Sequence, residues 1–422
     1  MIITSLSIAF PVFADTGAKL DSVVDELSEL YREETAQGKD TETSAESRII
    51  VKADMKPDTY GNAEMISGTD DIYIYQYETA EDAANALEYY DSLSFVEWAE
   101  TDGIVESQSS SFSADETFSY GADMLGSKYA KQYLETIDAP EINIALIDVG
   151  INFRLKSFKD TNRVIDSGIN LSDTGEEGTA QADVGSSSSV YHGSHITSIL
   201  LDNTASNVNI IGYKAMNRDG YGTVSAISAS IQKAVEDGAD IINLSLNGIG
   251  ETPSLIKEAI QDAYSNGVIC VVAVGNYNDD ALYYYPANMD EVFTVGAIDY
   301  RGNPCYLSNY GEEIDFVAPG YQVEVYGYNA SLDEPQYVNG TSFAAPFIAA
   351  ASAAALSVHP DYSVDEIKQL LIDSCVTKND LAYSSPYLRD IEIKDSSLSS
   401  LTFGNLGEKA KSEELYLSLI HI

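Results

Sequence analysis

The segment GVICVVAVGN, residues 267–276, is the clearest indication of the fold class. It is an apolar run that starts at a glycine and ends in the polar residue Asn276. Similar runs occur elsewhere: INIALIDVG (142–150), NIIGYKA (209–215), ADIINLSL (239–246) and VFTVGAI (292–298). Amphipathic stretches of helical period lie between several of them, such as 224–238 and 253–267. Apolar strands alternating with helices are typical of a parallel sheet covered on both faces. The sequence therefore predicts an α/β fold, with a mostly parallel sheet flanked by helices.

Composition narrows the class of protein. The chain has 422 residues and a formal net charge of −44, which argues against nucleic acid or an anionic membrane as partner. Its three cysteines are an odd number and do not form a disulfide framework. Cys270 lies within an apolar run and is interpreted as a buried small hydrophobe rather than a nucleophile.

The N-terminal residues have the pattern of an export signal. Residues 1–14 contain an apolar stretch that ends in small residues at VFA, as in a secretory signal peptide. Residues 15–47 are polar and charge-rich and are interpreted as a spacer. No transmembrane segment is predicted, because the apolar stretch after Ser342 is shorter than a span and contains Pro346. We therefore expect an extracellular protein.

Residues 48–108 have a different pattern of predicted strands and helices. RIIVKAD (48–54) and DIYIYQYE (71–78) indicate strands, 79–93 indicates a helix capped by Thr79, and 95–108 supplies more strand. This pattern predicts a small α+β unit of ferredoxin-like type. The Ser-rich stretch SQSSSFSADE (107–116) that follows is typical of an exposed linker.

Four polar residues stand where apolar strands end or helices begin: Asp148, His192, Asn276 and Ser342. In parallel sheets such positions gather at the carboxyl ends of the strands. Each has an ordinary alternative when taken alone. Asp148 could cap a loop, His192 and His195 could suggest a metal, and Ser342 could be a helix N-cap. No third metal ligand is evident, so no metal site is assigned.

Together the four residues form a chemically complete set. A serine hydroxyl is a weak nucleophile that needs a neighbouring base, and histidine suits that task near neutral pH. A buried aspartate orients the imidazole, and a side-chain amide donates to the oxyanion of acyl transfer. The order Asp148, His192, Ser342 is one of the known orders of such triads.

The motifs around these residues resemble those of subtilisin-like serine proteases over roughly residues 48–380. ALIDVG (145–150) resembles the family's Asp motif, HGSH (192–195) its His motif, and NGTSFAAP (339–346) its nucleophile motif. The resemblance implies that Asp148, His192 and Ser342 are catalytic. VAVGN (272–276) resembles the strand that ends in the oxyanion amide, so Asn276 and the Ser342 N–H would form the oxyanion hole.

Further matches imply where substrate binds. NLSLNG resembles the strand that pairs with an extended peptide, and RDGYGT resembles the opposite edge. YYYPAN resembles the base of the primary specificity pocket, which Tyr284 would narrow. The implied substrate-binding residues are Gly220, Tyr221, Gly222, Ser245, Leu246, Asn247 and Tyr284.

The resemblance also divides the chain. Residues 48–108 would be the family's inhibitory propeptide, with cleavage in the stretch from Gln108 to Thr117, and residues 109–380 the catalytic domain. Residues 381–416 would begin a C-terminal β domain such as a cell-surface module. Residues 417–422, LSLIHI, match a translated sequencing adapter and are interpreted as an artefact.

The expected protein is a secreted serine endopeptidase, made as a self-processing precursor and needing no cofactor. Its partners would be polypeptide substrates and its own propeptide. The net negative charge is compatible with weak calcium binding, but no calcium site is assigned. Departures from the family pattern motivate an alternative, a catalytically silent peptide-binding protein: Val149, Tyr191, Ser194, Thr197, Ser198 and Asn247. A related family with Glu in place of His and a nucleotide-binding α/β domain are disfavoured, since His192 is present and a phosphate loop is not.

Overall fold

A computed structural model describes residues 45–68, 71–107, 110–112, 120–185, 189–300, 302–327, 335–377 and 399–401. The predicted signal peptide, most of the spacer, and the C-terminal segment other than 399–401 lie outside the described residues.

The centre of the molecule is a nine-stranded sheet with strand order β19-β20-β16-β15-β13-β11-β7-β9-β8. Every neighbouring pair from β8 to β16 runs parallel. The predicted α/β class and mostly parallel sheet are thus confirmed. The strands are β7 (Ile142–Asp148), β8 (Val164–Asn170), β9 (Val208–Lys214), β11 (Ile241–Leu244), β13 (Ile269–Ala273), β15 (Val292–Ile298), β16 (Phe316–Pro319), β19 (Cys375–Thr377) and β20 (Ser399–Leu401).

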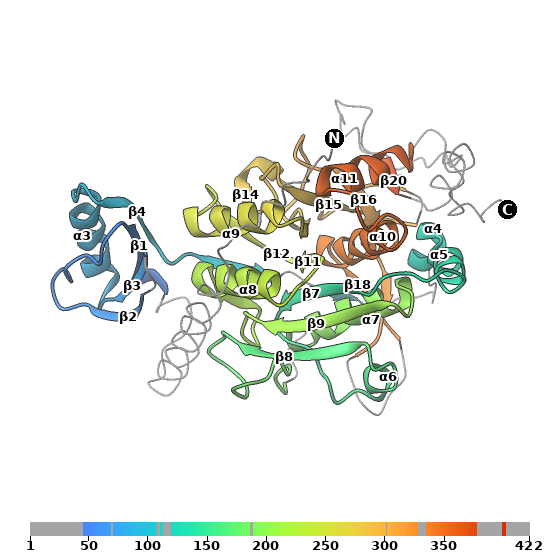
Figure 1. The fold of residues 1–422 in the computed structure, drawn as a ribbon, viewed down its shortest axis with the longest axis horizontal. Coiled ribbons are helices and arrows are strands. Elements are labelled where there is room, and N and C mark those ends of the chain that lie inside the picture. The colour runs from blue at the N-terminus through green and yellow to red at the C-terminus, as the bar shows by residue number, and fades with distance from the viewer. Residues whose placement is uncertain are drawn as a thin grey trace, which may run out of the picture.

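Side chains alternate between two hydrophobic cores because successive residues of a strand face opposite sides of the sheet. On β7, Ile144 and Leu146 join one core, while Ala145 and Ile147 join the other. The helices that cover the first core are α7 (His192–Asn203), α10 (Ala345–Val358) and α11 (Val364–Asp373), and those that cover the second are α8 (Val224–Glu236) and α9 (Ser254–Ser265). Figure 1 shows these two helical layers with the sheet between them.

The segment Thr341–Val358, which includes α10, is long and apolar enough to cross a membrane by length and composition. Within the described residues, 94% of this segment is buried inside the protein. It is therefore a core helix, packed on the sheet beside α7.

Residues 48–101 form a separate small unit, which we call the front unit (Figure 1, blue). Its antiparallel sheet has the order β2-β3-β1-β4, and helix α3 packs on one face. Thr79 is the N-cap of α3, as predicted, and accepts from the Asp82 N–H at 3.1 Å. Strand β2 was not predicted, because EMISG is short and lacks regular alternation. The elements are β1 (Arg48–Ala53), β2 (Glu64–Gly68), β3 (Ile72–Gln76), α3 (Ala80–Asp91) and β4 (Val96–Thr101).

The other face of the front unit packs against α8 and α9. Ile50 and Ile74 point away from α3 and belong to the same buried cluster as the residues of those two helices. At the edge of this contact, Lys52 reaches both carboxylate oxygens of Glu258 on α9 at 2.9 Å, and the Trp98 indole donates to Glu258 at 3.0 Å. Apolar burial thus holds the front unit to the helical layer, with polar contacts at its rim.

Candidate active site

Asp148 and His192 are brought together at the carboxyl end of β7. The His192 Nδ1 lies 2.9 Å from both carboxylate oxygens of Asp148, and both side chains are at most 1% exposed. A carboxylate only accepts hydrogen bonds, so Nδ1 carries the proton and Nε2 is left as the basic nitrogen. The Val149 N–H donates to Asp148 at 2.7 Å and holds the carboxylate without a side-chain hydroxyl.

Helix α7 can begin at His192 only because the next residue is Gly193. A Cβ on Gly193 would lie 2.3 Å from the Gly150 carbonyl oxygen and 3.2 Å from Asp148. The absence of that atom lets the first turn of α7 approach the end of β7. This contact sets the distance between His192 and Asp148.

Ser342 stands in the tight turn that precedes α10. Gly340 has a φ of +153°, a conformation that side-chain-bearing residues rarely adopt, and residues Thr341–Phe343 form a short 3-10 turn. The Ser342 hydroxyl donates to the Ser245 carbonyl at 3.2 Å, and the Ser245 hydroxyl donates back to the Ser342 carbonyl at 2.8 Å. These two reciprocal hydrogen bonds hold Ser342 against Ser245, the residue directly before Leu246.

His192 does not hydrogen-bond Ser342 in this structure. Among the described residues, the buried His192 Nε2 has no hydrogen-bond partner. The His192 ring lies 5.5 Å from that of Phe343, the residue after Ser342, but the direct hydrogen bond between His192 and Ser342 is not formed. Such bonds commonly shorten only when substrate is bound productively.

Asn276 lies beside the serine turn, at the end of β13. Its side-chain oxygen accepts from the Thr341 N–H at 2.8 Å, and the Thr341 hydroxyl accepts from the Gly275 N–H at 3.1 Å. Because the Thr341 N–H is a donor, the contacting atom of Asn276 is its Oδ1, which fixes the amide orientation. The NH₂ group is therefore presented on the other side of the amide.

Sequence reasoning missed two supports of this arrangement. Thr341 entered the sequence analysis only as part of the 339–346 motif, yet it joins the serine turn to the segment that follows β13. Asn309 donates to the Val274 carbonyl at 2.9 Å and accepts from the Tyr277 N–H at 2.9 Å, so it holds the chain on both sides of Asn276. Asn309 is distant in sequence and lies in no motif, so nothing in the sequence singled it out.

A second small sheet, with strand order β10-β5-β12-β14, passes the site. Its strands are β5 (Ile104–Ser107), β10 (Tyr221–Thr223), β12 (Leu246–Ile249) and β14 (Tyr284–Tyr285). β5 pairs antiparallel with both neighbours, Glu106 lying opposite Tyr221 on one side and opposite Asn247 on the other. The Gly220 carbonyl also accepts from the Ser107 N–H at 2.8 Å. The two edges assigned to substrate thus hold a segment of the chain itself.

The next described strand after β5 is β6 (Ser110–Phe112). This strand pairs antiparallel with β18 (Gln336–Asn339), with Ser110 opposite Asn339. Since β18 leads directly into the Gly340 turn and Leu246 follows Ser245, the pairings of β5 and β6 lie on either side of Ser342.

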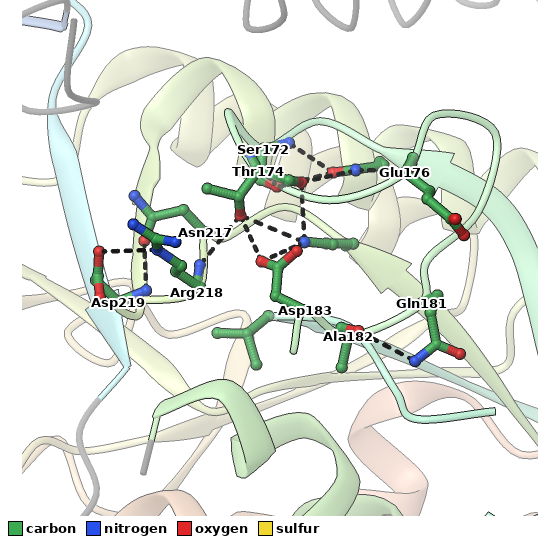
Figure 2. A network of polar contacts seen from close by, with 12 residues as sticks. Ser172, Thr174, Glu176, Gln181, Ala182, Asp183, Asn217, Arg218 and Asp219 are labelled. Carbon is green, nitrogen blue, oxygen red and sulfur yellow. Dashed lines mark hydrogen bonds and ion pairs between the residues drawn. The ribbon is translucent and has the colours of Figure 1, made fainter. Parts of the chain in front are cut away.

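A buried ion pair fixes the turn that precedes β10. Lys214 Nζ lies 2.7 Å from Asp183 and 2.9 Å from the Thr174 carbonyl, and its side chain is fully buried. The Thr174 hydroxyl donates to Asp183 at 2.5 Å and accepts from the Arg218 N–H at 3.2 Å. Figure 2 shows Thr174 and Asp183 beside the turn formed by Asn217, Arg218 and Asp219. Burial lowers the pKa of Lys214, and the charge of Asp183 opposes that shift.

Tyr284 is 3% exposed and its ring stacks on that of Tyr277, with centroids 5.3 Å apart and an interplanar angle of 23°. Its hydroxyl donates to Asp279 at 3.3 Å. Burial, and then the charge of Asp279, raise the pKa of Tyr284 to about 12, so the phenol stays protonated near neutral pH. The pair forms an aromatic wall next to Asn276.

The structure bears on two other roles considered from the sequence: a metal site that includes His195, and a nucleophilic Cys270. Burial lowers the pKa of His195 to about 3, with a further contribution from His192. Among the described residues, no group of three or more His, Cys, Asp or Glu side chains could hold a metal ion. Burial also raises the pKa of the Cys270 thiol to about 12, and a protonated thiol is a poor nucleophile.

The residues near His192 that differ from the family pattern form hydrogen bonds to neighbouring segments. The Ser194 hydroxyl accepts from the Asn152 N–H at 2.9 Å, and the Ser198 hydroxyl accepts from the Tyr326 N–H at 3.0 Å. The Tyr191 hydroxyl donates to the Gly185 carbonyl at 2.5 Å. These side chains tie α7 to its neighbours and leave the Asp148–His192 pair intact.

A buried aspartate–histidine pair, a serine in the turn before a core helix, and two strand edges that hold an extended segment between them are the features of a serine-type peptidase. A model of the subtilase family matches residues 140–390, and the chain belongs to that family. The enzyme is a hydrolase that acts on polypeptides, as the names of its relatives agree.

Among the relatives, subtilisin DY of Bacillus licheniformis is 36% identical over 212 residues, which are 48% of this chain and 76% of that protein. Subtilisin-like protease 1 of Pseudogymnoascus destructans is 30% identical over 330 residues, which are 74% of this chain and 75% of that protein. A solved protease from Pseudoalteromonas arctica superposes with a TM-score of 0.52 at 26% identity, covering 60% of this chain and 87% of its own. The silent peptide-binding alternative is not favoured, since these relatives are named as proteases.

Proposed function

We propose that the chain is a secreted serine endopeptidase made as a self-processing precursor, with Asp148, His192 and Ser342 as its triad. The observation that carries this proposal is the path of β5. It lies between the two strand edges of the peptide channel and runs toward Ser342, as a bound peptide substrate would. Residues 48–108 are the inhibitory domain and residues from 109 to about 380 the catalytic domain.

The proposed reaction is acyl transfer. The Ser342 Oγ attacks the scissile carbonyl carbon while the His192 Nε2 takes the hydroxyl proton, and Asp148 stabilises the imidazolium. The Asn276 NH₂ and the Ser342 N–H donate to the oxyanion. Collapse breaks the C–N bond, and Nε2 gives its proton to the leaving amine. Water then attacks the acyl-enzyme through the same base, and Ser342 regains its proton. Only side chains and water take part, so no cofactor is proposed.

The strand registers suggest which bond is cut. Ser107, the last described residue of β5, pairs with Leu246, which directly follows Ser245, whose carbonyl accepts from the Ser342 hydroxyl. On the other side, Ser110 already pairs with Asn339. The two registers leave the bond between Gln108 and Ser109 as the proposed scissile bond.

Contacts of the front unit support its role as inhibitor. Glu100 accepts from the Ser254 and Leu255 N–H groups at 2.9 and 3.1 Å, at the start of α9. Burial of apolar surface beside these contacts favours continued binding after cleavage, so release of the front unit would be a separate step.

Export is proposed from the names of relatives as well as from the sequence pattern. A relative from Natrialba magadii, 29% identical over 271 residues, is named a halolysin-like extracellular serine protease. That name belongs to the relative, and the present chain would share its compartment.

The test is the intact mass and N-terminal sequence of the expressed chain, beside its Ser342→Ala version. The parent should lose its N-terminal segment and begin at Ser109, while the Ser342→Ala chain stays intact. Mixing the two forms shows whether cleavage also occurs between molecules. If both forms stay intact although folded, the enzyme assignment of Ser342 and the self-processing scheme are wrong, and peptide binding without turnover becomes the better description.

A further inference from the structure

We infer that Tyr277 selects an acidic side chain at the third residue before the scissile bond, the position of Glu106. This inference rests on the proposed function, because it assumes that β5 lies where a substrate peptide binds. It adds a substrate class to that function: polypeptides with Glu at this position.

The position of Glu106 in the channel is fixed by backbone pairing on both sides. It lies opposite Tyr221 on β10 and opposite Asn247 on β12. Its side chain meets the Tyr277 hydroxyl, which donates to Oε1. Tyr277 directly follows Asn276, so the residue that would read the substrate is one peptide bond away from the proposed oxyanion donor.

Tyr277 is held ready for this contact by other groups. Its N–H donates to the Asn309 side-chain oxygen at 2.9 Å, and its ring stacks on the buried Tyr284. The ring of Tyr277 is nevertheless 43% exposed, as a residue that meets substrate must be. A donor that is already in place loses little conformational entropy when the peptide binds, so more of the hydrogen-bond energy appears as affinity.

The chemistry of the phenol favours a carboxylate over other side chains. A hydrogen bond from a neutral hydroxyl to a carboxylate is roughly twice as strong as one between neutral groups. Glutamine would keep a weaker bond, and alanine none. The formal charge of −44 would by itself favour basic peptides. That general attraction is screened by salt, whereas the Tyr277 contact is short-range and directional.

The first test compares the processed enzyme with its Tyr277→Phe version on four peptides. Peptides with the sequence of residues 103–112 carry Glu, Gln, Ala or Lys at position 106, and kcat/KM is measured for each. The parent should cleave the Glu peptide about tenfold faster than the Ala peptide, from a charge-assisted bond of typical strength. The Tyr277→Phe enzyme, which keeps the ring stack, should cleave the two at equal rates.

Tyr306, which is 67% exposed and lies in no segment assigned to substrate, supplies the matched control, because Tyr306→Phe should leave the Glu-to-Ala ratio unchanged. The inference is wrong if the ratio of kcat/KM for the Glu and Ala peptides is the same in the parent and in Tyr277→Phe. It is also wrong if the parent cleaves the Lys peptide fastest. In both cases the enzyme assignment stands. Loss of all cleavage in the parent would instead overturn the proposed function.

A second readout does not depend on catalysis. In the uncleaved Ser342→Ala chain, hydrogen exchange of the β5 backbone is compared for Glu106→Ala, Tyr277→Phe and both together. The inference expects either single change to speed exchange several-fold and the double change to add little more. Independent, additive effects of the two changes would overturn it.

Discussion

Asp102, which directly follows the last strand of the front unit, accepts two hydrogen bonds from Ser225, one from its N–H at 2.9 Å and one from its hydroxyl at 2.7 Å. Ser225 lies in the first turn of α8, where N–H groups have no partner within the helix. Arg48 pairs with the same carboxylate at 2.7 Å, and both side chains are fully buried. The front unit therefore caps α8 through Asp102, just as it caps α9 through Glu100.

The Glu100 contact should make docking of the front unit depend on pH. Burial raises the pKa of Glu100 above its ordinary value of 4.5, and hydrogen bonds from Ser254 and Leu255 only partly offset this. Just above pH 4.5 the docked form then binds more protons than the released form, so docking weakens as pH rises through this window. Size-exclusion chromatography of the cleaved complex across pH measures the effect, and Glu100→Gln should flatten it. An unchanged slope in that variant would rule out Glu100 as the source.

Buried His195 should make the fold sensitive to acid. The unfolded chain takes up a proton near the ordinary histidine pKa of 6.5, whereas the folded chain keeps His195 neutral down to about pH 3. The unfolded state thus binds more protons in this window, and stability falls as pH drops from about 6.5 toward about 3. Urea unfolding of the Ser342→Ala chain at several pH values measures this slope. His195→Leu should reduce it, and an equal slope in both proteins would contradict the assignment.

Lys214→Met should weaken the substrate edge as well as the fold. The change leaves the Asp183 carboxylate, whose side chain is 9% exposed, without its cation, and breaking such buried pairs costs about 3–5 kcal/mol. The turn at Arg218 loses its anchor, so KM for peptides should rise more than kcat falls. Lys233→Met removes a more exposed pair with Asp237 on α8 and should cost under about 1 kcal/mol. Equal effects of the two changes would argue against a special role of the buried pair.

Asn276→Ala should lower kcat roughly 100- to 1,000-fold with little change in KM, a range measured for the loss of one oxyanion donor in subtilisin itself. The effect falls on kcat because the oxyanion exists only beyond the ground state. Steady-state kinetics on the processed enzyme gives both constants, and a thermal melt checks that the Thr341 turn survives. A rise in KM at constant kcat would instead assign Asn276 to substrate binding.

Tyr284→Ala should change which residue is accepted just before the scissile bond. The parent ring is buried, stacks on Tyr277, the residue after Asn276, and donates its hydroxyl to Asp279. Removing it should raise the rate for a peptide with Phe at position 108, relative to Gln, by at least about tenfold, since each extra methylene in such a pocket is worth 10- to 200-fold. Competition between the two peptides measures the ratio. An unchanged ratio would show that Tyr284 does not border this position.

Much of the site could be predicted because each of its polar residues stands at a strand end or helix start within a regular pattern. Asp148 ends the apolar run of β7, and Asn276 follows that of β13. Their meeting follows from the parallel order of the strands, whose carboxyl ends share one edge of the sheet. Asn309 and Thr341 could not be found in this way, because their roles depend on hydrogen bonds between segments that no periodicity relates.

The α/β alternation, the ends of the strands and the order of the proposed triad can be read from the sequence, because hydrophobic period and turn chemistry are local properties. Three features depend on the tertiary fold: β5 lies between β10 and β12, Tyr277 contacts Glu106, and Asp102 and Glu100 reach the starts of two helices. These contacts join residues more than a hundred positions apart. They depend on how the front unit packs on α8 and α9, and that packing is a property of complementary surfaces rather than of any one segment.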